Sequence, residues 1–195
     1  SQISKNGRVT RREFLWLSSM AAAGLAAACA TNPVTGRSQL MLVSEDQEIQ
    51  IDKQYAPYQF SADYGPVQDN ALNAYIDRTG KNLAVGSHRT HMPYNFHAVN
   101  ANYVNAYAFP GGTIACTRGI LLSLDNEAEL AALLGHELGH VNARHTAEQM
   151  SKGMLTQVVV GGLSIAAGTA GGIYGNIASQ LGQLGAGALL ASYSR

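Results

Sequence analysis

Five consecutive residues, His136-Glu137-Leu138-Gly139-His140, place two histidines and a glutamate at a spacing that can hold a metal ion. Residues four apart on an α-helix differ by only about 40° in azimuth and about 6 Å in rise, so His136 and His140 face the same way and can share one zinc ion. Glu137 is turned by about 100° from His136, so its carboxylate can reach a water at the metal without being a ligand. The motif predicts metal-assisted hydrolysis with one zinc ion per chain and Glu137 as general base.

An amphipathic helix with solvated His and Glu side chains is the plain alternative. The flanking residues argue against it, because they make this helix mostly apolar, and buried ionisable groups need partners. These flanking residues are Leu130, Ala131, Leu133, Leu134 and Leu138.

The helix that carries the motif has a clear start. Asp125 or Asn126 can cap it, and acidic residues in its first turn suit the helix dipole, so we expect it to run from Glu127 to about His145. Three strands are expected upstream. Alternation of side chains predicts the first, over about 94–99, and two more are expected over about 103–109 and 113–122. The second of the three ends at the turn Pro110-Gly111-Gly112.

Two further helices are expected before the strands. Ser44 followed by Gln47 forms a capping-box pattern and opens a helix over about 45–60, which Gly65-Pro66 interrupts. Asp69 can cap the next helix, which reaches about Leu83.

The composition fits one ordinary domain. The chain has 195 residues, of which 46% are hydrophobic, with 13 Lys+Arg against 13 Asp+Glu. Such a chain can build a core and is not of the disordered class. The zero net charge offers no electrostatic case for binding nucleic acid. Two cysteines cannot build a disulfide framework, and Cys116, in an apolar run, is expected to be a buried thiol.

The first 28 residues are expected to be an export signal. Arg11-Arg12 resembles a twin-arginine motif, and the uncharged stretch that follows is too short to span a bilayer. Small residues before Cys29 resemble a lipobox, which would make Cys29 the lipidated first residue of the mature chain. Ala30 in place of Asp favours the outer membrane. We therefore divide the chain into a signal (1–28), a lipidated tether (29–43) and a catalytic domain (44–195).

Around the His-Glu motif the chain resembles the HtpX-like and CaaX-protease-like zinc metallopeptidases, which are gluzincins. The matching segments are Asn105–Gly112, Thr117–Leu121 and Asn126–Val141, and Asn32–Gly36 resembles the mature start of lipoprotein members. The resemblance implies a predominantly helical α+β metalloprotease domain with a small sheet beside the active helix. Its implied substrates are unfolded or misassembled envelope proteins, and the implied substrate-binding strand and turn contain Asn105, Ala106, Tyr107, Pro110, Gly111 and Gly112.

A catalytic zinc ion normally has three protein ligands. The resemblance places the third on a Glu in a later helix, whose segment would begin where the sequence reaches Arg195. After His140 the only carboxylate is Glu148. On a continuous helix His145 lies about 140° round from His140, and Glu148 about 12 Å along, so neither fits unless the helix breaks. We expect the third ligand beyond Arg195, and expect the 195-residue form to be truncated, to bind zinc poorly and to cleave little.

Other features leave alternatives open. Arg144 and His145 resemble family positions near the site; His145 either approaches the metal or substrate after a local rearrangement, or is a surface residue stabilised at a helix C-terminus. The uncharged, Gly-rich stretch 153–194 either forms amphipathic helices beside the cleft or a membrane-inserted hairpin.

His88, His91 and His97 lack ligand spacing and are expected to be solvated or structural. The alternative function is a non-catalytic envelope lipoprotein that escorts proteins with an incomplete metal site.

Overall fold

A computed structural model describes residues 29–160, together with positions 11, 12 and 16. The expected export signal and most of the stretch 153–194 lie outside the described residues. None of the helices within the described part is long and apolar enough to cross a membrane. The elements are β1 (Cys29–Thr31), β2 (Ser38–Leu40), α2 (Glu45–Ala62), α3 (Asn70–Ala84), β3 (Asn95–Val99), β4 (Ala106–Ala108), β5 (Thr113–Thr117), α4 (Arg118–Leu121), α5 (Glu127–Asn142) and α6 (His145–Val160).

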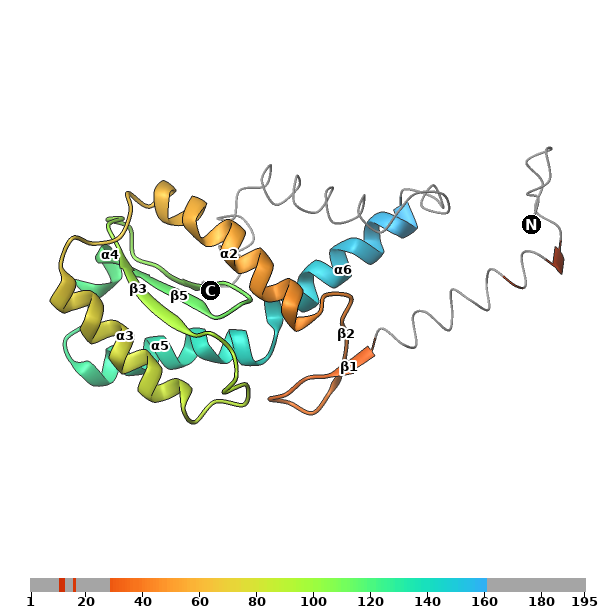
Figure 1. Cartoon of the computed structure of the whole chain (residues 1–195), viewed down its shortest axis with the longest axis horizontal. Helices are drawn as coiled ribbons and strands as arrows, with labels where there is room; N and C mark the ends of the chain where they lie inside the picture. The colour runs from red at the N-terminus through yellow and green to blue at the C-terminus, as the bar shows by residue number, and fades with distance from the viewer. Residues whose placement is uncertain (1–10, 13–15, 17–28, 161–195) are drawn as a thin grey trace.

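Three layers make up the body of the molecule, which confirms the expected α+β class. A three-stranded sheet lies between α2 on one face and α3 and α5 on the other (Figure 1). Its strand order is β3-β5-β4, with β3 parallel and β4 antiparallel to β5. The α5 face of the sheet is fully apolar and buried, and is formed by Phe96, Ala98, Ala108, Ile114 and Cys116.

The predicted helix starts are confirmed. The Ser44 hydroxyl accepts a hydrogen bond from Gln47 N at 3.3 Å, and the Gln47 side chain accepts one from Ser44 N at 2.8 Å. Asp69 caps α3, and Asn126 caps α5 through Glu129 N at 3.1 Å. These caps are local in sequence, which is why the pattern alone could place them.

Three predicted boundaries are wrong. The strand expected over 103–109 begins only at Ala106, since the Tyr103 carbonyl and Asn105 N bond to the Thr117 hydroxyl. The strand expected over 113–122 ends at Thr117, whose hydroxyl caps the short helix α4 by accepting from Ile120 N at 3.3 Å. Gly119 allows this turn, since a Cβ there would lie 2.3 Å from the Asn102 carbonyl oxygen. The helix expected to reach His145 ends at Asn142, because Arg144 adopts a left-handed backbone conformation with φ 56°.

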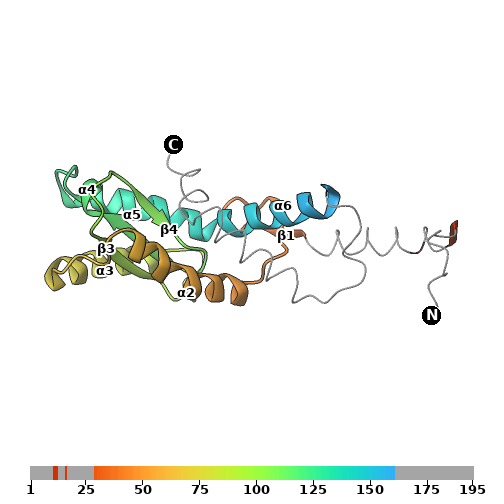
Figure 2. The same cartoon turned by 90° about the horizontal axis from the view of Figure 1, so that it is seen from above.

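Residues 29–43 form a β-hairpin that packs on the α5–α6 junction. Asn32 shapes its turn by accepting hydrogen bonds from Val34 N at 2.8 Å and Thr35 N at 3.0 Å. The Asn32 amide also donates to the Ala143 carbonyl at 3.0 Å. Leu42 N, just after β2, donates to the Ser151 hydroxyl of α6 at 2.8 Å. In Figure 2, α5 and α6 follow one another on the side of the molecule opposite α2. The segment expected to be a tether is therefore hydrogen-bonded directly to the end of α5, the helix that carries the His-Glu motif.

Candidate active site

Helix α5 presents the two histidines on the side that faces away from the core. Leu130, Leu134 and Leu138 are buried among the sheet residues, whereas His136 is exposed and His140 is half-buried. The helix is therefore buried on one face, and the predicted ligands lie on the accessible face.

The two histidines converge as the spacing predicts. Nε2 of His136 lies 3.1 Å from Nε2 of His140, and the two rings are nearly perpendicular. Two nitrogens that each lie about 2.0–2.1 Å from one tetrahedral zinc ion are about 3.3 Å apart. The donor atoms and their separation therefore fit two ligands of one zinc ion.

Glu137 lies on the inner side of the same turn. It is only 8% exposed, and burial raises the pKa of its carboxyl group to about 7. Cys116 on β5 is fully buried, and burial together with the nearby Glu137 carboxylate raises its thiol pKa to about 12. A carboxylate whose pKa lies near neutrality is suited to take and return a proton.

Glu137→Gln is expected to stabilise the metal-free protein at high pH. Burial in the folded state raises the pKa of this carboxyl. The protonated carboxyl therefore contributes fully to stability below about pH 4.5, and that contribution is lost as the pH rises through about 7. Glutamine mimics the protonated form at every pH. We expect the variant to gain up to about 3 kcal/mol in the free energy of unfolding at pH 8 and almost nothing at pH 4.

Urea unfolding at pH 4 and pH 8, in the presence of a chelator, measures this difference. The exposed acid Asp46 supplies the control as Asp46→Asn. An equal effect of Glu137→Gln at both pH values would contradict the burial argument.

His145 lies beside His140 rather than at a helix C-terminus. The chain breaks at Arg144, and His145 becomes the first residue of α6. Its Nδ1 lies 2.8 Å from Nδ1 of His140. His145 thus begins α6 instead of ending α5, and the helix break that an approach to the histidine pair requires is present.

No third ligand joins the pair within residues 29–160. His145 contacts the opposite ring nitrogen of His140 from the one that faces His136, so these three rings do not surround a common point. Glu148 pairs with Lys152 at 2.8 Å instead. Across the described part of the chain, no three His, Cys, Asp or Glu side chains are grouped to hold a metal.

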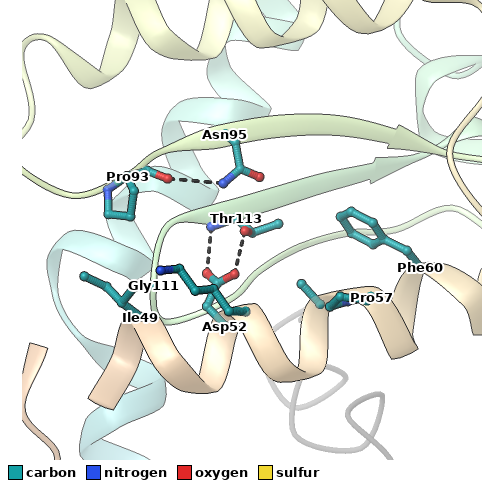
Figure 3. Close-up of a pocket in the computed structure, with 10 residues that line it drawn as sticks. Ile49, Asp52, Pro57, Phe60, Pro93, Asn95, Gly111 and Thr113 are labelled. Carbon is teal, nitrogen blue, oxygen red and sulfur yellow. Dashed lines mark hydrogen bonds between the residues drawn. The ribbon is translucent and has the colours of Figure 1, made fainter. Parts of the chain in front are cut away.

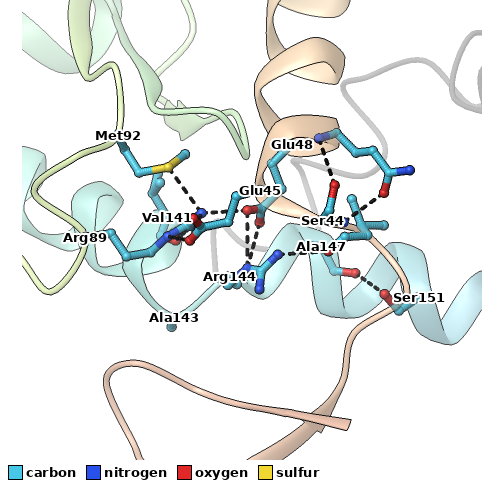
Figure 4. Close-up of polar contacts among 12 residues, drawn as sticks. Ser44, Glu45, Glu48, Arg89, Met92, Val141, Ala143, Arg144, Ala147 and Ser151 are labelled. Carbon is cyan, nitrogen blue, oxygen red and sulfur yellow. Dashed lines mark hydrogen bonds and ion pairs between the residues drawn. The ribbon is translucent and has the colours of Figure 1, made fainter. Parts of the chain in front are cut away.

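A buried ion cluster holds the end of α5. Glu48 of α2, which is fully buried, accepts from Arg89 Nη2 at 2.6 Å and from Arg144 Nε at 3.2 Å (Figure 4). Arg89 Nη1 also donates to the Val141 carbonyl at 2.9 Å. The sequence analysis missed this cluster, because Arg89 and Arg144 lie 41 and 96 positions after Glu48 and follow no local pattern.

Strand β4 forms the edge of the sheet beside α5. On the opposite edge, side chains of α3 cap the outward amides of β3: Asp77 accepts from Phe96 N and Asn73 from Ala98 N, both at 3.2 Å. Among the described strands, none pairs with the outer side of β4.

The pairing of β4 with β5 decides which of its backbone groups face outward. Phe109 N donates to the Thr113 carbonyl at 2.7 Å, and Thr117 N to the Asn105 carbonyl at 3.0 Å. Because hydrogen-bonded positions alternate along a strand, the N–H and C=O groups of Ala106 and Ala108 point outward. An extended polypeptide could pair with them.

The residues of the predicted strand and turn do not all lie on the same side. Ala108, Pro110 and His140 line one small cavity, which places the end of β4 beside the histidine pair. Gly111 contacts α2 instead, where a Cβ would lie 2.5 Å from Cβ of Asp52. Tyr107 packs in the α2-side core, and its hydroxyl donates to Asp63 at 2.6 Å.

A larger pocket of about 280 Å³ lies between α2 and the sheet, on the face opposite α5 (Figure 3). Ile49, Pro57 and Phe60 give it apolar walls. Asp52 at its base accepts hydrogen bonds from the backbone and hydroxyl of Thr113 at 2.9 and 2.6 Å. Since the sheet separates it from His136 and His140, this pocket is not part of the histidine site.

The remaining histidines are solvated or structural, as predicted. His88 is exposed. His91 Nε2 lies 3.0 Å from a Glu45 carboxylate oxygen. His97 contacts the Asn95 side chain at 2.7 Å, and burial lowers the pKa of its ring.

Comparison with known proteins identifies the family. The sequence profile of Peptidase family M48 matches residues 70–195. The chain belongs to this family. Peptidases of family M48 are zinc-dependent, which confirms the resemblance to zinc metallopeptidases and agrees with the donor geometry of the histidine pair.

Several bacterial relatives carry names that describe proteases. The chain is 35% identical over 120 residues to the beta-barrel assembly-enhancing protease of Yersinia pestis, covering 62% of this chain and 24% of that protein. It is 38% identical over 104 residues to metalloprotease LoiP of Escherichia coli, covering 52% of this chain and 39% of LoiP. It is 30% identical over 131 residues to metalloprotease YcaL of Escherichia coli, covering 65% of this chain and 50% of YcaL. The chain thus spans a quarter to a half of the length of these relatives.

Proposed function

We propose that this chain carries the catalytic helix of a zinc-dependent endopeptidase of the bacterial cell envelope. The supporting observation is the pair of Nε2 atoms 3.1 Å apart, with the buried Glu137 carboxyl on the same helical turn. His136 and His140 would hold one zinc ion, and the third ligand would be a carboxylate outside residues 29–160, as the family resemblance implies. When bound, zinc would polarise the scissile carbonyl group and make water more acidic.

The chain's own residues supply the remaining steps. Glu137 takes a proton from the attacking water and delivers it to the leaving amine. The outward backbone groups of Ala106 and Ala108 hold the substrate in an extended conformation beside His140. Backbone pairing tolerates many sequences, so an unfolded polypeptide is a suitable substrate.

The substrate class and the location follow from the relatives and the N-terminus. Two features support an envelope role: relatives named for β-barrel assembly, and the lipobox-like residues before Cys29. We therefore propose that misassembled outer-membrane proteins are the substrates. We also propose that a lipid on Cys29 attaches the protein to the outer membrane, facing the periplasm, after export through the signal 1–28.

One preparation of the full-length protein tests this function. Extracted from the membrane fraction of its host, it should carry a diacyl or triacyl modification on Cys29, measured by mass spectrometry of its N-terminal peptide. It should contain one zinc ion, cleave an unfolded β-barrel protein and spare the folded form. A chelator should abolish cleavage, and added zinc should restore it. Cleavage that survives complete zinc removal would contradict the proposal.

A further inference from the structure

The two ring nitrogens of His140 face different partners. Nε2 faces His136 at 3.1 Å, where the proposed zinc ion would bind, and Nδ1 faces Nδ1 of His145 at 2.8 Å. The rings of His140 and His145 are tilted by 60°, with centroids 5.1 Å apart, so they meet through their nitrogens rather than by stacking. The second contact has the length of a hydrogen bond.

A hydrogen bond between two ring nitrogens contains one proton. Which of the two histidines carries that proton decides whether Nε2 of His140 has a lone pair for a metal. If His145 donates, then the neutral His140 ring carries its own proton on Nε2 and has no lone pair there for a metal. If His140 donates from Nδ1, its Nε2 keeps a free lone pair. The hydrogen bond at one nitrogen thus selects which nitrogen can bind metal.

The fold holds His145 in this place through Arg144. Arg144 has φ 56°, a left-handed backbone conformation that is unfavourable for a residue with a Cβ. The Arg144 guanidinium offsets this by donating to the buried Glu48 carboxylate at 3.2 Å and to the Val43 carbonyl at 2.8 Å (Figure 4). On an unbroken helix His145 would face about 140° away from His140.

We propose that His145 is a positioning residue of the metal site: its Nδ1 accepts a hydrogen bond from Nδ1–H of His140 and so presents a free lone pair on Nε2 of His140 to the metal. This inference rests on the zinc site of the proposed function. Groups that orient metal-binding histidines in this way are usually carboxylates or carbonyl oxygens. Here a second imidazole, delivered by the break at Arg144, takes that role.

The test measures the tautomer of His140 and the affinity for zinc separately, both in the full-length protein. In the metal-free chain, long-range nitrogen–proton NMR correlations should show the His140 proton on Nδ1. In His145→Phe, which keeps the ring and removes the acceptor, that preference should be lost, and zinc affinity should fall about 10–100-fold in competition with a chromogenic chelator. His145→Asn, whose side-chain oxygen can accept the same hydrogen bond, should restore most of both.

The exposed His88 provides a matched control as His88→Phe, which should change neither measurement. A proton on Nε2 of His140 in the wild-type metal-free chain would overturn the proposal, even if His145→Phe failed to fold. So would unchanged tautomer and affinity in a folded His145→Phe. A full-length wild-type protein that shows the expected tautomer but binds no zinc would instead count against the zinc site, and would leave the role of His145 in the tautomer supported.

Discussion

Glu137→Gln in the full-length protein is expected to lower the rate of peptide hydrolysis by about 10²–10⁴-fold. The amide has nearly the shape of the carboxyl group, but it cannot take a proton from the attacking water. Glu137 is buried and is not one of the two side chains whose Nε2 atoms face each other, so the variant should keep its zinc.

The measurement is kcat/KM on an unfolded protein substrate, together with zinc content by elemental analysis. Glu127→Gln, at an exposed position in the first turn of the same helix, is the matched control and should retain activity. A zinc-loaded Glu137→Gln preparation that cleaves at the wild-type rate would remove Glu137 from the mechanism. A wild-type protein that binds zinc and substrate without cleaving would favour the non-catalytic alternative.

Glu48→Ala is expected to cost about 3–5 kcal/mol of folding stability. Glu48 is fully buried and faces two guanidinium groups, of which Arg89 is itself only 2% exposed. Removing the carboxylate leaves positive charge in the interior without its compensating partner. That loss is a large fraction of the roughly 5–15 kcal/mol that stabilises an ordinary domain.

Chemical denaturation of the metal-free protein measures this loss. Glu45→Ala is the matched control, because Glu45 also binds Arg89, at 3.0 Å, but has a side chain that is 42% exposed. Such a partly exposed pair is worth about 1 kcal/mol or less. Equal losses for the two variants would mean that the buried cluster does not stabilise the fold.

The Glu48 variant should also affect the site. The cluster holds the Val141 carbonyl and Arg144, on either side of the point where α5 ends. Residues that bear no catalytic group thus connect α2 to the position of His145. If Glu48→Ala lowers the free energy of unfolding and also removes the preference of His140 for the Nδ1–H tautomer, both results would be consistent with this connection.

Local patterns predicted the elements well where local forces decide them. The caps at Ser44, Asp69 and Asn126 are confirmed, because each satisfies backbone groups within three residues of itself. Strand ends were less predictable. The strand after Thr113 stops at Thr117, since the close approach of Gly119 to the Asn102 backbone turns the chain into α4, and that contact is not visible in a pattern of alternation.

The sequence by itself determined the helix that places His136, Glu137 and His140, because the geometry of one helical turn fixes how those three side chains point. Only the tertiary structure decided where that helix ends. Spacing arguments hold along an unbroken helix, and the break at Arg144 depends on Glu48 and Val43, which lie 96 and 101 positions away in the chain. For this reason the sequence could name His145 as a candidate, but only the packing of α2 against the α5–α6 junction brought its ring to Nδ1 of His140.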